Sequence, residues 1–223
     1  MILGSAAWLL MIGTFSVMAL HYEQEETAYL EFPCSVEGTS LIAQYLAAYE
    51  GPYMEDGTNE HAVDIAAIVL ENSGEQGIEF VTVTLCWENG EYVFEATSIP
   101  PQSSILVLEK SCQTYRVGQW TRCYGNQKLY QGEWNGSGIF AADYGLGELI
   151  VTNLTEDVLK NITVYHKAYL SPPDIYVGGV SYETNILQLM PGESVRIMPT
   201  NYAVGGSKIT RIIYTHRQIP GND

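Results

Sequence analysis

Residues Ile78–Trp87 read IEFVTVTLCW, and this stretch decides the class of fold that the sequence predicts. Its apolar side chains recur at every second position, beginning with Val81, Val83 and Leu85, and threonine fills the places between them. Successive side chains of a β-strand point to opposite faces of a sheet. A period of two therefore predicts a strand with one buried face.

Short runs of the same kind recur along the chain, separated by turns rich in Gly, Pro and Asn. We expect further strands at Ile65–Leu70, Tyr92–Ala96, Ile105–Leu108, Leu149–Thr152, Ile162–Tyr169, Ile186–Met190, Ser194–Met198 and Lys208–Thr215, with a strand-like lead-in at Leu41–Tyr49. No amphipathic helical segments alternate with these runs, which argues against a parallel α/β fold. Spacings of 8–12 residues with such turns indicate an all-β protein built from antiparallel sandwiches.

The strand pattern occurs twice in the same order. The matching blocks are Ile68–Asn72 with Leu149–Asn153, Val81–Val83 with Ile162–Val164 and, after a nine-residue insertion, Ile99–Leu108 with Leu189–Met198. Chance similarity between two β-rich segments is the alternative, because most matches are of apolar type only. The repeat predicts one sandwich in residues 28–140 and a second in residues 141–223.

The block order resembles the CARDB and fibronectin type III branch of the immunoglobulin-like sandwiches, through Ile68–Asn72, Val81–Leu85 and Ile99–Leu108. The longer stretch Tyr49–Lys110 is similar to uncharacterised, membrane-anchored proteins of Gram-positive anaerobes. The first copy departs from the usual turn, because Gln102 stands where glycine is common. The resemblance implies two tandem immunoglobulin-like sandwiches at the cell envelope, and it implies no catalytic residue.

The segment 2–20 carries no charged side chain and has no polar stripe at helical spacing. As a helix, 19 residues span roughly 28 Å, close to the hydrocarbon thickness of a bilayer. We favour a single-pass signal anchor with the C-terminal domains outside the cell membrane. The alternative is a signal peptide cleaved after Ala19, which would give a secreted protein. An acidic linker at residues 21–27 follows in either case.

The charge is strongly negative and unevenly distributed. The chain of 223 residues has a net charge of −16, and no Lys or Arg precedes Lys110. The 17 acidic residues before that point account for the whole imbalance, because the remainder carries 10 basic and 9 acidic side chains. A chain this acidic repels phosphate, which excludes nucleic acid as an expected partner.

Four cysteines, Cys34, Cys86, Cys112 and Cys123, all lie before residue 124. An even number on an exported chain predicts two disulfides. Pairing Cys112 with Cys123 is the most local option and would leave Cys34 with Cys86, but the sequence does not choose among the three connectivities. A zinc site is disfavoured because close pairs such as C-x-x-C are missing.

The sequence contains no arrangement typical of an enzyme. His61 lies near acidic residues, but the G-x-S-x-G setting of a nucleophilic serine is missing. His166 continues the apolar face after Val164, and we interpret it as a core or edge histidine. We therefore expect no catalytic activity and no resident cofactor.

One acidic loop offers oxygen ligands for a cation. Glu55, Asp56, Asn59 and Glu60 surround a glycine, and calcium prefers such oxygen donors. The spacing does not match an EF-hand, so a solvated acidic turn is the competing interpretation.

Aromatic residues are the other candidates for ligand contact. Trp120, Tyr124, Tyr130 and Trp134 lie in an irregular stretch rich in Gly and amide side chains. Packing inside or between the domains is the alternative role for them. The sequence thus predicts a membrane-anchored structural or protein-interaction protein of the cell envelope, with a carbohydrate-binding module as the alternative.

Overall fold

The computed structural model describes residues 29–52, 61–132, 134, 140–145, 148–199 and 206–216. The strands are β1 (Cys34–Ser35), β2 (Leu41–Pro52), β3 (His61–Asn72), β4 (Ile78–Trp87), β5 (Gly90–Ile99), β6 (Ser103–Leu108), β7 (Arg122–Leu129), β8 (Phe140–Gly145), β9 (Glu148–Asn153), β10 (Leu159–Leu170), β11 (Ile175–Leu189), β12 (Ser194–Ile197) and β13 (Ser207–His216). The expected all-β class is confirmed in this part of the chain.

The membrane segment predicted at residues 2–20 and the linker at 21–27 lie outside the described residues. Within the residues that are described, no helix is both long and apolar enough to span a bilayer.

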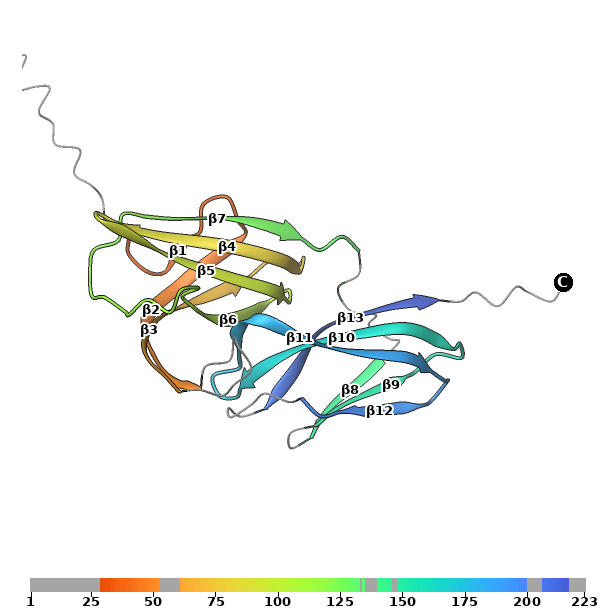
Figure 1. Cartoon of the computed structure of the whole chain (residues 1–223). Coiled ribbons are helices and arrows are strands. Elements are labelled where there is room, and N and C mark those ends of the chain that lie inside the picture. Colours follow the sequence, from red (N-terminus) through yellow and green to blue (C-terminus); the bar gives the residue numbers. More distant parts are fainter. Residues whose placement is uncertain are drawn as a thin grey trace, which may run out of the picture.

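The strands form one large sheet and two small ones (Figure 1). The large sheet has seven strands in the order β1-β2-β3-β6-β11-β10-β13. The small sheets have the orders β5-β4-β7 and β12-β9-β8. In Figure 1, β1–β7 lie at the upper left and β8–β13 at the lower right, and we call these the N-terminal and C-terminal halves.

The pairing order of the N-terminal half recurs in the C-terminal half. Strand β3 lies between β2 and β6 as β9 lies between β8 and β12, and β4 lies between β5 and β7 as β10 lies between β11 and β13. The predicted boundary after residue 140 therefore falls at the first residue of β8. Three strands were missed by the sequence analysis, namely β1, β7 and β8. Strands β7 and β8 lie in the stretch that we expected to be irregular.

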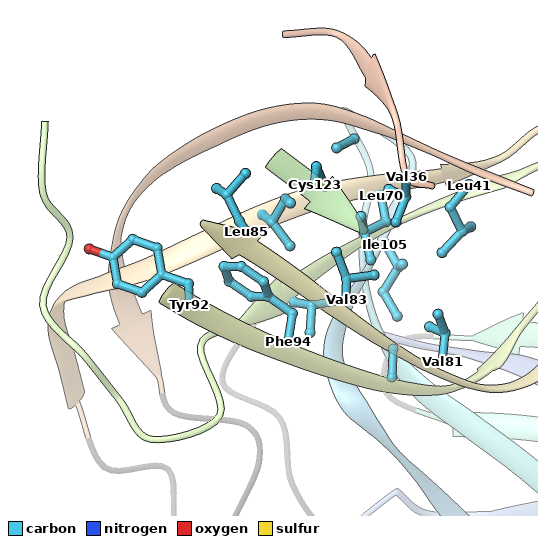
Figure 2. Packing of buried hydrophobic residues seen from close by; sticks show 14 of the residues in the cluster. Val36, Leu41, Leu70, Val81, Val83, Leu85, Tyr92, Phe94, Ile105 and Cys123 are labelled. Atoms are coloured by element: carbon cyan, nitrogen blue, oxygen red, sulfur yellow. The ribbon is translucent and has the colours of Figure 1, made fainter. Parts of the chain in front are cut away.

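The core of the N-terminal half lies between two layers of strands (Figure 2). Val81, Val83 and Leu85 of β4 are fully buried there, as their spacing predicts. Leu70 and Ile105 come from the opposite layer and meet them. Burial of each large aliphatic side chain contributes roughly 1.5–3 kcal/mol, so the alternating face of β4 supplies much of the hydrophobic stabilisation.

Each half contains a buried asparagine at the end of its central strand. Asn72 donates from Nδ2 to the carbonyl oxygens of Gln76 (2.9 Å) and Pro100 (3.0 Å). Asn153 donates from Nδ2 to the carbonyl oxygens of Asp157 (2.8 Å) and Leu189 (3.1 Å). The side-chain oxygen of each asparagine accepts a backbone N–H two residues further on. These Asx turns join the end of one strand to a distant turn.

The turn after β5 also recurs after β11. Gln102 has φ +52° and its counterpart Gly192 has φ +72°, so both adopt the left-handed conformation. Glycine adopts this conformation without steric cost, whereas other residues do so rarely. The Gln102 amide donates to the carbonyl oxygens of Ser73 and, at 3.2 Å, Gly74. These contacts explain how glutamine replaces the usual glycine.

The two halves are joined by strand β11. Its first part pairs in parallel with β6, with Tyr176 opposite Ile105 and Val177 opposite Leu106. Its next part lies against β5, where the hydroxyl of Thr97 donates to the carbonyl of Gly179 at 3.1 Å. A Cβ atom on Gly179 would lie 2.0 Å from the Glu95 carbonyl oxygen, so only glycine fits at this contact.

Lys167 supports the joining strand from β10. Its side chain is fully buried, and the ammonium donates to the carbonyl oxygens of Gly178 (3.1 Å) and Gly179 (2.6 Å). The contact fixes the backbone of β11 at the point where it meets β5. The halves therefore share a continuous sheet and a packed junction rather than a simple linker.

Candidate functional site

The most distinctive surface of the described chain is an open strand edge on the C-terminal half. Among the described residues, the second part of β11, beyond its contact with β6, pairs only with β10, through residues such as Ile186 and Gln188. Within the same part of the chain, β12 pairs only with β9 and forms the edge of its sheet. Unpaired edges present free N–H and C=O groups and are ready to accept another strand.

The equivalent edge of the N-terminal half is covered. With the offset of the sequence repeat, Leu187 corresponds to Thr97, which contacts β11. Met198 corresponds to Leu108, which is only 3% exposed. Leu187 is 86% exposed and Met198 is 64% exposed. The C-terminal half therefore exposes apolar side chains at two positions that are covered in the N-terminal half, by β11 at Thr97 and by β3 at Leu108. We call Asn185–Leu187 of β11, Val195–Arg196 of β12 and Met198 the open edge.

The open edge was not identified from the sequence. The sequence contains one indication of it. The repeat alignment places Leu187 where Thr97 stands, and a leucine in place of a threonine is unexpected at a position that faces solvent. Met198 gave no signal, because leucine and methionine are both apolar. The exposure of each residue depends on which distant strand covers it.

A second candidate is an aromatic hollow of about 540 Å³ at the other end of the molecule. Trp87 at the end of β4 and Trp120 before β7 lie 5.7 Å apart between ring centroids, at an interplanar angle of 82°. Tyr92 packs against Trp87 at 4.7 Å and donates its hydroxyl to the carbonyl of Thr114. Trp120 is 8% exposed, so it forms the floor of the hollow.

The rim of this hollow is polar. Glu88, Asn89, Arg116 and Gln119 line it together with the exposed ring of Tyr29. The Arg116 guanidinium lies 5.8 Å from the centroid of the Trp87 ring. Amide and charged groups around aromatic rings are suited to hydrogen bonding and stacking with a polar ring such as a sugar.

The four predicted ligand-binding aromatics lie in three different places. Trp120 lines the aromatic hollow. Tyr124 on β7 lies beneath the guanidinium of Arg122, 4.7 Å from the ring centroid. Tyr130 and Trp134 contact each other edge to face, with ring centroids 5.6 Å apart. They do not form one continuous binding surface.

Tyr130 and Trp134 contact the C-terminal half through Arg211. The buried guanidinium of Arg211 on β13 lies 4.5 Å from the centroid of Tyr130 and 5.7 Å from that of Trp134. The Trp134 ring lies so close to Gly77 that a Cβ atom there would be 1.8 Å from it. Cation–π contacts of this kind stabilise a desolvated arginine.

The histidines of the described chain do not form a catalytic pair. His61 is exposed and lies 3.6 Å from Glu50. His166 is 4% exposed and stacks on Tyr182, with ring centroids 5.8 Å apart. Burial lowers the pKa of His166 to about 4, so its imidazole is neutral at pH 7.

The predicted calcium ligands Glu55, Asp56, Asn59 and Glu60 lie outside the described residues. Among the residues that are described, no cluster of three or more His, Cys, Asp and Glu side chains has the arrangement of a metal site.

All four cysteines are free thiols in this structure, so it does not support the two predicted disulfides. Cys112 is exposed and occupies a turn in which its N–H donates to the carbonyl of Glu109. Cys123 is buried in the core, so the local pairing of these two residues receives no support from their surroundings. The thiol that lies near Cys123 is that of Cys34, and each of the two shifts the pKa of the other.

No protein-family model matches this chain. A search of curated proteins likewise finds no significant match.

Proposed function

We propose that this protein is a single-pass, membrane-anchored protein of the cell envelope, whose two immunoglobulin-like sandwiches bind a protein partner outside the cell. The observation that carries this proposal is the open edge of the C-terminal half. Leu187 and Met198 are exposed there, whereas the equivalent Thr97 contacts β11 and the equivalent Leu108 is buried against β3.

The apolar segment 2–20 supports the location, because it has the length and composition of a membrane span. If that segment is the anchor, the described strands stand between the membrane and the partner. The packed junction through β6 and β11 would then hold the two halves in a fixed orientation. A rigid support of this kind suits a protein that presents a binding surface away from the membrane.

The junction also indicates the chemistry of the partner. Strand β11 meets the N-terminal half through parallel pairing at Ile105 and Leu106 and through a glycine backbone against β5. The corresponding partner would add an extended segment beside Val195 and Arg196 of β12. It would present small residues opposite Asn185 and an apolar surface to Leu187. Strand addition to an open edge uses main-chain hydrogen bonds for affinity and side-chain contacts for specificity.

A photo-crosslinking amino acid at position 187 tests the proposal in cells that naturally produce the protein. We expect one defined envelope protein to crosslink from position 187 and from position 198. The matched control is position 45, because Tyr45 is 48% exposed on β2, which β3 and β6 separate from β11 in the large sheet. Equal crosslinking from position 45, or none from positions 187 and 198, would overturn the proposal.

The aromatic hollow favours a second candidate, binding of a glycan. Tyr29 and Trp87 offer ring surface, and Asn89 and Gln119 offer hydrogen bonds. We expect Tyr29→Ala to abolish any signal on a glycan array, whereas Tyr124→Ala on β7 leaves it unchanged. A wild-type chain that binds no glycan on the array would eliminate this candidate.

A further inference from the structure

Three of the four cysteines gather at one end of the N-terminal half. Cys34 lies on β1, Cys86 on β4 and Cys123 on β7. The thiols of Cys34 and Cys123 lie close enough for each to shift the pKa of the other, and Cys34 packs against the core cluster that contains Cys123. They belong to different sheets, because β1 pairs with β2 and β7 pairs with β4.

The backbone brings the two segments together along several residues. Leu30 donates its N–H to the Trp120 carbonyl at 2.7 Å, and Glu37 donates to the Cys123 carbonyl at 3.1 Å. The carboxylate of Glu37 also forms an ion pair with Arg122 at 2.8 Å. The approach of Cys34 to Cys123 is therefore fixed by contacts on both sides of the pair.

The other two cysteines are placed differently. In the pairing of β4 with β7, Leu85 lies opposite Cys123 and Cys86 lies opposite Arg122. Because side chains alternate along a strand, Cys86 points to the opposite face of the sheet from Leu85 and Cys123. Cys123 points into the core beside Leu85 (Figure 2). Cys112 is exposed in the turn after β6.

We propose that Cys34 and Cys123 form a disulfide that fastens the first strand to β7, while Cys86 and Cys112 remain thiols. The oxidant is a disulfide compound, either a small molecule or a thiol oxidoreductase. The thiolate of Cys34 attacks one oxidant sulfur, forms a mixed disulfide and releases the other sulfur as a thiol. The thiolate of Cys123 then attacks Cys34 and releases the second oxidant thiol. In total the protein loses two protons and two electrons, and the oxidant is reduced to two thiols.

The order of these two attacks follows from exposure. Cys34 is half-buried and reaches the oxidant first, whereas Cys123 is buried. Burial raises the pKa of Cys123 to about 12, so its thiolate is scarce at neutral pH. We therefore expect the second step to limit the rate in the folded chain and to become faster between pH 7 and pH 9.

The bridge has a mechanical consequence for the fold. Strand β1 has only two residues, and its pairing with β2 consists of Cys34 opposite Ala43 and Ser35 opposite Ile42. A covalent link from Cys34 to β7 would transmit tension from the N-terminal side of the chain into the core. In the anchored protein proposed above, this is the end that faces the membrane. The disulfide itself does not depend on the partner or the anchor, so either proposal can fail alone.

The test uses the full chain, purified in mild detergent in the reduced state and then treated with oxidised glutathione. Alkylation and mass spectrometry should show the number of free thiols falling from four to two, with one linked peptide that joins Cys34 to Cys123. The melting temperature should rise by roughly 5–15 °C on oxidation. Hydrogen exchange at the Leu30 and Glu37 amides should become slower.

Cys34→Ala should abolish both the linked peptide and the thermal shift. The matched variant Cys112→Ser should retain both, because Cys112 is exposed in a turn. A linked peptide that contains Cys86 or Cys112 would overturn the proposal. Four alkylatable thiols in the wild-type chain after oxidation would overturn it equally, and this measurement does not depend on how any variant folds.

Discussion

The two halves of the molecule share one order of strand pairing but differ in what covers the same edge. In the N-terminal half, β5 and β6 lie against β11. In the C-terminal half, the equivalent parts of β11 and β12 have no further strand beside them in the described residues. The comparison shows that one edge of a repeated strand order can hold the molecule together while its counterpart remains exposed.

One difference between the cores of the two halves lies on β10. Leu85 of β4 is buried in the N-terminal half, and the residue at the same offset on β10 is His166. The Nδ1 atom of His166 has no hydrogen-bond partner in the structure. An unsatisfied polar group in a core reduces stability. At this position the C-terminal half therefore carries an unpaired polar atom where the N-terminal half has an apolar side chain.

The largest expected effect concerns the buried asparagines that the halves share. Asn72→Ala and Asn153→Ala should each lower the free energy of unfolding by about 4 kcal/mol, because buried carbonyl and N–H groups lose their partners. Urea denaturation measures the change. Asn126→Ala, at an exposed position of β7, is the control and should change stability by less than about 0.5 kcal/mol. A small loss at only one of Asn72 and Asn153 would show that the two turns are not equivalent in energy.

Because His166 takes the place of Leu85 in the C-terminal half, we expect the stability of the chain to depend on pH. Between its unfolded pKa of 6.5 and its folded pKa of about 4, the unfolded chain binds a proton that the folded chain does not. Stability therefore falls as pH falls through this range, by roughly 3 kcal/mol for this group. His166→Leu, which restores the residue of the N-terminal half, should make the decline shallower by that amount. Identical profiles of stability against pH for the two chains would contradict this prediction.

The junction between the halves is tested at Gly179. Gly179→Val should destabilise the chain by about 2 kcal/mol, because the new side chain meets the Glu95 carbonyl oxygen. Small-angle scattering should show an increased radius of gyration as the halves separate. Gly118→Val is the control, since a Cβ atom at Gly118 has no neighbour within 4 Å. An unchanged radius with Gly179→Val would mean that the junction adapts to the added volume.

The smallest expected effect is at the shared turn. Gly192→Gln should cost about 1 kcal/mol, because a side chain is placed in the left-handed conformation without the contacts that Gln102 makes. Gln102→Gly should be closer to neutral, since relief of backbone strain offsets the lost hydrogen bonds. Thermal unfolding measures both. Equal losses at the two sites would show that the side-chain contacts of Gln102 do not compensate for its conformation.

Much of the strand pattern could be predicted from local sequence, and β4 shows why. The inward side chains Val81, Val83 and Leu85 alternate with threonines, so the buried face can be recognised from the local sequence alone. Strand β7 was missed because RCYGNQKL has mixed polarity. Its place is set by pairing with β4, from Cys86 opposite Arg122 to Ile78 opposite Leu129. Such pairing depends on a partner that is distant in sequence.

The candidate sites were harder to predict than the strands. Trp120 was chosen as an aromatic in an irregular stretch, and it does line a hollow. Trp134 was chosen for the same reason but packs on Gly77 and Arg211. Composition alone cannot separate these two cases, because an aromatic ring gains stability from burial as readily as from a ligand.

The sequence by itself determined that this chain is all-β, and it predicted that the pattern of strands occurs twice. Both properties can be read from local sequence, because alternating apolar side chains mark each strand and turn residues mark its ends. Only the tertiary structure decided which edge is covered, which thiols meet and which aromatics remain accessible. Each of those outcomes requires segments that are far apart in the chain to approach each other. Cys34 approaches Cys123 in this way, and Thr97 approaches Gly179. Contacts of that kind arise from packing the sheets together, and no local pattern encodes them.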